Sequence, residues 1–284
     1  MKGQASTGHV PLAWTRDDIE QRLFFPGGWH TRVNMGLTFL LALLTTIAFY
    51  AALIPYDTSV FAKTFTVSKV QYATVLLSAW SLIILLFKWS KLLYQRRALG
   101  FRVVPTEADF VLSAANVDHV VDRVYEIVDD PKYFILYKRI VIALANLKNL
   151  GRIGDVDEIL RSQAENDDGA VETSYAVLSG FVWAIPVLGF IGTVIGLSYS
   201  IGEFGNVLKG AKDMEEITGS LRNVTAGLTQ SFETTLVALI AALVIQLLIT
   251  FLKKSEQEFL DDCSQYCTAN VVNRLRIMPF ELAE

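Results

Sequence analysis

The amino-acid sequence predicts an all-α membrane protein with four transmembrane helices and a cytoplasmic helical bundle between the second and the third. Three observations predict this fold. Of the 284 residues, 52% are apolar and only 19% are charged, which is too apolar for an ordinary soluble domain of this length. Four runs are long and apolar enough to cross a bilayer. The segment between the second and third runs shows helical periodicity.

The four apolar runs set the predicted domain boundaries, since about 20 helical residues span the roughly 30 Å hydrocarbon core. They extend over about Val33–Ile54, Val70–Trp89, Ala176–Ile201 and Val224–Leu252. The predicted parts are an N-terminal cytoplasmic segment (1–32), transmembrane helices one and two (33–93), a cytoplasmic helical domain (94–175), transmembrane helices three and four (176–252) and a cytoplasmic C-terminal helix (253–284).

The distribution of basic residues predicts the orientation. Lysines and arginines collect before the first run and after the second, whereas the loop between these runs holds only Lys63 and Lys69. Basic residues favour the cytoplasmic side of a membrane. The sequence therefore predicts a multi-pass protein with both termini in the cytoplasm.

Local signals predict the helices outside the membrane. Thr15 with Asp18 resembles a capping box and predicts a short interfacial helix in the N-terminal segment. In the central segment, Pro105 is expected to open one helix, which ends before Asp129-Asp130-Pro131, and a second follows through Leu147. Asp155 is expected to cap a third, short helix.

Composition excludes several function classes. The net charge is −4 and the basic residues are scattered, so a nucleic-acid binder is not expected. Cys263 and Cys267 have no histidine near them in sequence, and a structural zinc site needs four ligands. We expect no metal site and no cofactor. The absence of a P-loop or nucleophile motif from the sequence argues against an enzyme.

Small residues predict a helix-packing face on the third and fourth runs. In the third run, Gly189, Thr193, Gly196 and Ser200 recur at spacings of four, three and four, so they share one side of a helix. Such stripes let helix backbones approach closely in lipid. The predicted packing residues are Gly189, Gly192, Gly196, Ser200, Gly227, Ser231 and Ala238. Close packing alone and an ion pathway are both compatible with this stripe.

Hydroxyl groups and one carboxylate in the fourth run favour a pathway. Thr234 and Thr235 lie beside Glu233 in an otherwise apolar run, and an ionisable side chain in a span normally faces a cavity or a partner. Glu233 is thus a candidate ion-handling group. Alternatively, it lies near the outer membrane surface, where water reaches it, and only ends the helix there. Pro186 in the third run predicts a kink, which serves either as a hinge or as static packing.

Two motifs resemble those of a known family. Residues 186–197, PVLGFIGTVIGL, resemble the signature of the MotA/TolQ/ExbB proton-channel family, and residues 227–239, GLTQSFETTLVAL, are similar to its other pore helix. The resemblance covers about Ser174 to Leu252. Four spans resemble MotA, whereas TolQ and ExbB have three.

The resemblance implies an A-type subunit of an ion-driven motor in the bacterial inner membrane. Such subunits form a ring, a homopentamer around a dimer of a MotB/ExbD/TolR-like single-span protein whose aspartate carries the proton or sodium ion. Thr193 and Thr235 match the threonines that ring the pore, and Pro186 matches the proline at its cytoplasmic side. The glutamate that TolQ and ExbB carry in the last pore helix aligns with Gln230, so Glu233 is a candidate substitute.

Two other functions are compatible with the sequence. Instead of a motor subunit, the chain would be either a transporter that needs no partner helix or a structural membrane scaffold. A transporter normally has its binding site at a broken helix or a repeat interface, and the first and second pairs of runs show no repeat. The process that a motor of this kind drives is not encoded in these motifs.

Overall fold

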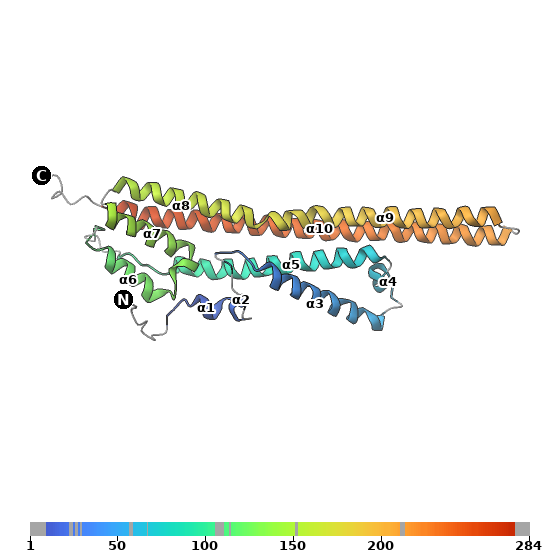
Figure 1. Cartoon of the computed structure of the whole chain (residues 1–284), viewed down its shortest axis with the longest axis horizontal. Coiled ribbons are helices and arrows are strands. Elements are labelled where there is room, and N and C mark those ends of the chain that lie inside the picture. The colour runs from blue at the N-terminus through green and yellow to red at the C-terminus, as the bar shows by residue number, and fades with distance from the viewer. Residues whose placement is uncertain are drawn as a thin grey trace. The chain divides into compact units, whose positions relative to one another are not determined.

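In a computed structural model of the protein, the described residues are 10–275 apart from 23–24, 26–27, 29, 57–58, 67, 106–110, 114, 151–152 and 211–213. These residues are mainly helical (Figure 1). The α-helices are α1 (Trp14–Asp17), α2 (Ile19–Arg22), α3 (Met35–Leu53), α4 (Val60–Thr66), α5 (Lys69–Arg97), α6 (Val117–Ile127), α7 (Ile135–Leu150), α8 (Ile153–Ser174), α9 (Ala176–Gly210) and α10 (Met214–Asn270). Short 3-10 helices follow α3, α5 and α10 and precede α7, at Ile54–Tyr56, Ala98–Gly100, Val272–Arg274 and Pro131–Tyr133.

Four helices, α3, α5, α9 and α10, are long and apolar enough to cross a membrane, which confirms the four predicted spans. Their most apolar stretches bury only 22–28% of their residues inside the protein. Large apolar side chains such as Leu44, Trp183 and Leu243 are more than half exposed. So much exposed apolar surface requires lipid or neighbouring subunits to cover it. The chain is therefore a multi-pass membrane protein.

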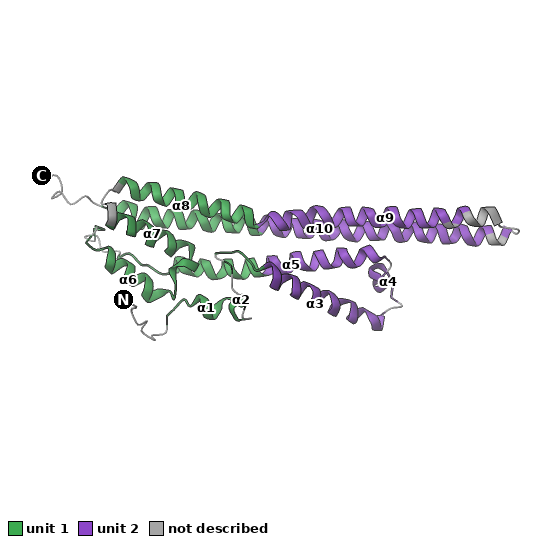
Figure 2. Cartoon of the chain, in the orientation of Figure 1, with its two compact units in different colours: residues 1–34, 87–174, 252–284 green, residues 35–86, 175–251 purple. Residues whose placement is uncertain are grey.

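The chain forms two compact units (Figure 2). Unit 1 consists of residues 1–34, 87–174 and 252–284, and unit 2 consists of residues 35–86 and 175–251. Helices α5 and α10 contribute residues to both units because each continues well beyond its apolar stretch. The N-terminal segment, which the sequence predicted as a separate part, belongs to unit 1.

The core of unit 1 forms around α6, α7 and α8. Val117, Val120 and Val124 recur at helical spacing and are buried on one side of α6. In α7, the buried Arg139 donates from Nε to Asp167 Oδ2 of α8 at 2.7 Å and from Nη1 to Ser264 Oγ of α10 at 2.9 Å. This charged centre joins the consecutive helices α7 and α8 to α10, which is distant in sequence.

Two predictions for the central segment differ from the structure. Helix α6 begins at Val117 and not at Pro105, although residues 106–110 lie outside the described residues. The third helix, α8, is 22 residues long and not short, and Asp155 lies in its first turn rather than at its cap. The cause is continuity, since α8 leads directly into the third span at Tyr175.

The N-terminal segment forms two one-turn helices instead of the single helix predicted. Thr15 lies inside α1, and its backbone N–H and hydroxyl both donate to Asp129 Oδ2 at 3.0 Å, so the capping box is wrong. Trp14 is fully buried. Its ring stacks on Tyr133 at 5.7 Å between centroids and meets Phe134 edge-on at 5.5 Å. Burial of this tryptophan fastens the segment to unit 1.

Aromatic contacts hold the first two spans of unit 2 together. Trp80 of α5 donates from Nε1 to Thr38 Oγ1 of α3 at 3.1 Å, and its ring lies 4.7 Å from that of Phe181 in α9. Near the far end of α3, the ring of Tyr50 lies 4.4 Å from that of Tyr72. Helix α4 lies between the first two spans and was not predicted, because its seven residues are too few for a clear helical period.

Candidate functional site

In unit 2, α9 and α10 run antiparallel side by side (Figure 1) and approach each other closely. A Cβ atom added to Gly189 would lie 2.6 Å from Ala238 Cβ and 3.2 Å from the backbone of Thr235. One added to Gly192 would lie 2.9 Å from Thr234 Cγ2. Glycine is therefore required at both positions, because the opposing helix already occupies the space of a side chain.

The register of this contact continues along both helices. Gly196 faces the hydroxyl of Ser231, and Gly227 faces the hydroxyl of Ser200. Each step of three or four residues along α9 thus matches a step of three or four residues in the opposite direction along α10. The structure places all seven residues predicted for the packing face on this contact line: Gly189, Gly192, Gly196, Ser200, Gly227, Ser231 and Ala238.

Thr193 and Thr235 meet at the same level of the helix pair. Their hydroxyl groups are hydrogen-bonded to each other. Thr193 Oγ1 also lies 3.2 Å from the carbonyl oxygens of Gly189 and Ser231, and Thr235 Oγ1 donates to Gly189 O at 2.8 Å. Both threonines are only half-buried, so the pair is a small polar centre that still reaches the surface of the α9–α10 pair.

Pro186 lies seven residues, or about two turns, before Thr193 inside α9. A proline removes one backbone donor and disturbs the preceding turn. Helix α9 nevertheless continues from Ala176 to Gly210. The proline therefore weakens the turn of α9 that precedes it without ending the helix.

The other two predicted pathway residues occupy different positions. Thr234 is buried against Gly192, and its hydroxyl donates to Gln230 O at 3.1 Å within its own helix. Glu233 is half-buried. Since successive helical residues are about 100° apart, Glu233 lies roughly 200° around α10 from Thr235. The structure thus brings Thr193 and Thr235 together, uses Thr234 for packing and separates Glu233 from both.

Two buried lysines in unit 1 were missed as functional candidates, because the sequence marked them only as basic residues at a membrane edge. Lys88 Nζ donates to Glu256 at 3.0 Å and to Ser174 Oγ at 2.9 Å, and both charged side chains are 1% exposed. Lys91 Nζ donates to Glu20 Oε2 at 2.6 Å. The sequence does show each lysine next to an apolar run. It does not show that each lysine is buried and paired, because the partners Glu256 and Glu20 lie far away in sequence.

The fold and this site define a multi-pass helical membrane protein whose last two spans form a tightly packed pair with a hydroxyl centre. The sequence model of the MotA/TolQ/ExbB proton channel family matches residues 135–265, from α7 through most of α10. This match covers a little under half of the chain and supports its membership of the family, which confirms the resemblance predicted from the motifs. Comparisons with curated proteins and with solved structures gave no match.

We predict that Gly189→Ala destabilises the α9–α10 pair by about 1–3 kcal/mol, because the added methyl group would overlap Ala238. Gly202→Ala in the same helix is the matched control, since no atom lies within 4 Å of the new Cβ. It should be neutral or slightly stabilising because alanine favours helix. Thermal unfolding of the full chain in lipid nanodiscs measures both. Equal effects of the two substitutions would contradict the close contact.

For the buried ion pair, Lys88→Met should destabilise the protein by about 3–5 kcal/mol, since it leaves the Glu256 carboxylate buried without its cation. The double variant Lys88→Met with Glu256→Leu should recover most of the loss. Denaturant unfolding of the purified chain gives the comparison. As a control, Lys253→Ala breaks an exposed pair with Glu172 and should cost less than about 1 kcal/mol.

Proposed function

We propose that this chain is the A-type subunit of an ion-driven motor, in which α9 and α10 line a path for protons or sodium ions. The observation that carries the proposal is the Thr193–Thr235 hydroxyl pair inside the segment that matches the family. Membership of a proton channel family supports conduction, and it assigns the chain to a class associated with channels rather than with enzymes.

The hydroxyl pair has the hydrogen-bonding capacity that such a path needs. Each hydroxyl has one proton to donate and two lone pairs that accept. Three acceptors surround the Thr193 proton, namely the carbonyls of Gly189 and Ser231 and the Thr235 hydroxyl. The hydroxyls can therefore turn and offer a lone pair to a passing cation while their protons stay bonded to a carbonyl oxygen.

The chain itself supplies little charge for binding an ion. The four predicted spans contain no aspartate, and their only carboxylate is that of Glu233. We infer that the ion-binding acid comes from a MotB/ExbD/TolR-like single-span partner, present as a dimer inside a homopentameric ring of this chain. Glu233 and Gln230 are three residues apart and therefore neighbours on α10. This spacing supports Glu233 as an accessory group in place of the family glutamate.

We further propose that the complex lies in the bacterial inner membrane with unit 1 and both termini in the cytoplasm. The basic residues flanking the first two spans support this orientation. An ion that crosses 100 mV releases about 2.3 kcal/mol per charge. This energy is sufficient to bias one step of rotation of the ring around the partner, and the helices of unit 1 would then pass the work to whatever the motor drives.

The test is flux through the complex of this chain with its partner, reconstituted in lipid vesicles under a proton or sodium gradient. Thr193→Val and Thr235→Val keep the side-chain shape but remove a hydroxyl, so each should lower the flux by roughly tenfold, the effect of losing one hydrogen bond in the path. Thr193→Ser should retain most of the flux. Thr250→Val is the matched control, because the Thr250 hydroxyl bonds only within α10, to Gln246 O.

Three results would overturn the proposal. Undiminished flux in both valine variants, with intact complexes, would remove the hydroxyl pair from the path. Flux by the chain alone would indicate a partner-independent transporter. A complex that assembles without conducting either ion would indicate a structural scaffold. Native mass spectrometry of the same complex tests the expected five copies of this chain.

A further inference from the structure

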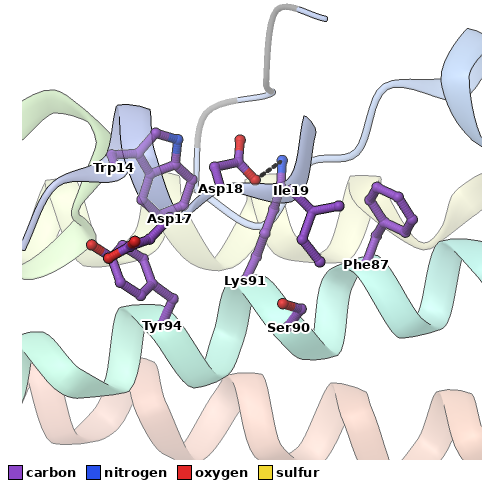
Figure 3. A pocket seen from close by; sticks show the side chains of 8 residues that line it. All are labelled: Trp14, Asp17, Asp18, Ile19, Phe87, Ser90, Lys91 and Tyr94. Atoms are coloured by element: carbon purple, nitrogen blue, oxygen red, sulfur yellow. Dashed lines mark ion pairs between the residues drawn. The ribbon is translucent and has the colours of Figure 1, made fainter. Parts of the chain in front are cut away.

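A small cavity lies in unit 1 where the N-terminal segment packs on α5 (Figure 3). Its apolar walls are the side chains of Trp14, Ile19 and Phe87. The polar groups around it are Asp17, Asp18, Ser90, Lys91 and Tyr94. The channel proposal uses none of these residues.

The carboxylate of Asp18 is buried at this cavity without adequate partners. Its side chain is 1% exposed. Within the part of the chain that the structure describes, neither carboxylate oxygen accepts a hydrogen bond. The nearest cation is Lys91 Nζ, 3.9 Å from Oδ1 (Figure 3). A buried carboxylate without hydrogen bonds is costly while it is charged.

Lys91 is already engaged by other groups. Its ammonium donates to Glu20 Oε2 at 2.6 Å and to the carbonyl oxygen of Arg32 at 2.7 Å. Two buried carboxylates, those of Asp18 and Glu20, thus share one ammonium, and the shorter contact belongs to Glu20. The groups that face Asp18 are Lys91, Ser90 and Tyr94 from α5, Glu20 from α2 and Asp17 from α1.

The neighbouring aspartate provides a contrast within the same turn. The Asp17 side chain is 24% exposed and pairs with Arg16 at 3.2 Å. The hydrogen bond from Arg16 lowers the pKa of Asp17. For Asp18, burial has the largest effect and raises the pKa; the charge of Lys91 and the nearby backbone N–H of Glu20 lower it, the charge of Glu20 raises it, and the net shift is upward. The two adjacent carboxyl groups are therefore shifted in opposite directions.

We propose that Asp18 binds a proton in the folded protein and that this proton fastens residues 12–22 to α5. A neutral Asp18 removes the repulsion between two carboxylates and leaves the Lys91 ammonium to Glu20. Glu20 in turn accepts hydrogen bonds from the backbone N–H groups of Gly28, at 3.1 Å, and Asn34, at 2.7 Å. Asn34 immediately precedes α3. The proton on Asp18 thus supports the contacts that fix the start of the first span.

The pH dependence follows from the direction of the shift. Because the pKa of Asp18 is higher in the docked state than in an undocked segment, docking is tightest below the ordinary aspartate pKa of about 4 and weakens as the pH rises through the raised value. One proton is released on undocking in this range. The docking equilibrium should therefore fall by up to about tenfold per pH unit and then level off.

Hydrogen exchange of the amides of residues 12–22, measured against pH on the full chain in lipid nanodiscs and corrected for the intrinsic rate, tests this inference. In the wild-type chain, the opening equilibrium constant of this segment should rise by up to about tenfold per pH unit. In Asp18→Asn, this constant should not change with pH, because the asparagine amide does not titrate. Asp17→Asn is the matched control and should keep the wild-type slope. A flat wild-type profile, or a wild-type slope in Asp18→Asn, would overturn the proposal.

Infrared spectroscopy of the wild-type chain with isotope-labelled aspartate gives a second readout that does not depend on how a variant folds. A protonated aspartic acid should be visible at a pH where ordinary aspartates are ionised, and it should titrate together with the exchange profile. If all labelled aspartates are ionised at that pH, Asp18 holds no proton. Both measurements are independent of conduction, so failure of the channel proposal leaves them unaffected.

Discussion

The close approach of α9 and α10 is the constraint on which the candidate pathway depends. Where Gly189 faces Ala238, the backbones are too close for any side chain. This proximity lets the Thr235 hydroxyl cross to the Gly189 carbonyl and meet Thr193. In lipid, the hydrophobic effect does not favour association of helices, so packing and hydrogen bonds between them must hold the pair together. The residues of this contact therefore determine both the stability of the α9–α10 pair and the position of the Thr193 and Thr235 hydroxyls.

Unit 1 contains buried ion pairs as well as apolar packing. Arg139, Lys88 and Lys91 are all buried, and each is paired with a carboxylate from a different part of the chain. Buried ion pairs add little net stability compared with apolar residues, but breaking one is costly. They therefore select one arrangement of α5, α7, α8, α10 and the N-terminal segment over others that apolar packing alone would allow.

Sequence patterns predicted the features that depend on periodicity and composition. Four apolar runs gave the four long helices, and the spacing of Gly189, Gly196 and Gly227 predicted small faces on both helices of the pair. The family resemblance was confirmed, and the match extends back to Ile135, beyond the range of about Ser174 to Leu252 that the motifs had indicated. Helical periodicity alone separates Glu233 from Thr235, but it could not show that Thr235 is the one that faces α9.

The failures of prediction lie where a distant contact determines local structure. Thr15 reads as part of a capping box, yet Asp129, 114 residues away, binds its hydroxyl. Asp18 was read as the other half of that box and instead lies buried beside Lys91. For Thr15, a long-range hydrogen bond replaces the predicted local one. For Asp18, burial beside Lys91 replaces it, and a single sequence reveals neither long-range contact.

The partners of the two buried lysines become available at different times during synthesis. Glu20 precedes Lys91 in the chain, so this pair can form as soon as α5 has been made. Glu256 follows Lys88 by 168 residues, so Lys88 lacks this partner until α10 has emerged. During that interval its charge is not yet neutralised by Glu256, and basic residues beside a span favour the cytoplasmic side of the membrane. The Lys88–Glu256 pair is therefore completed only late in synthesis.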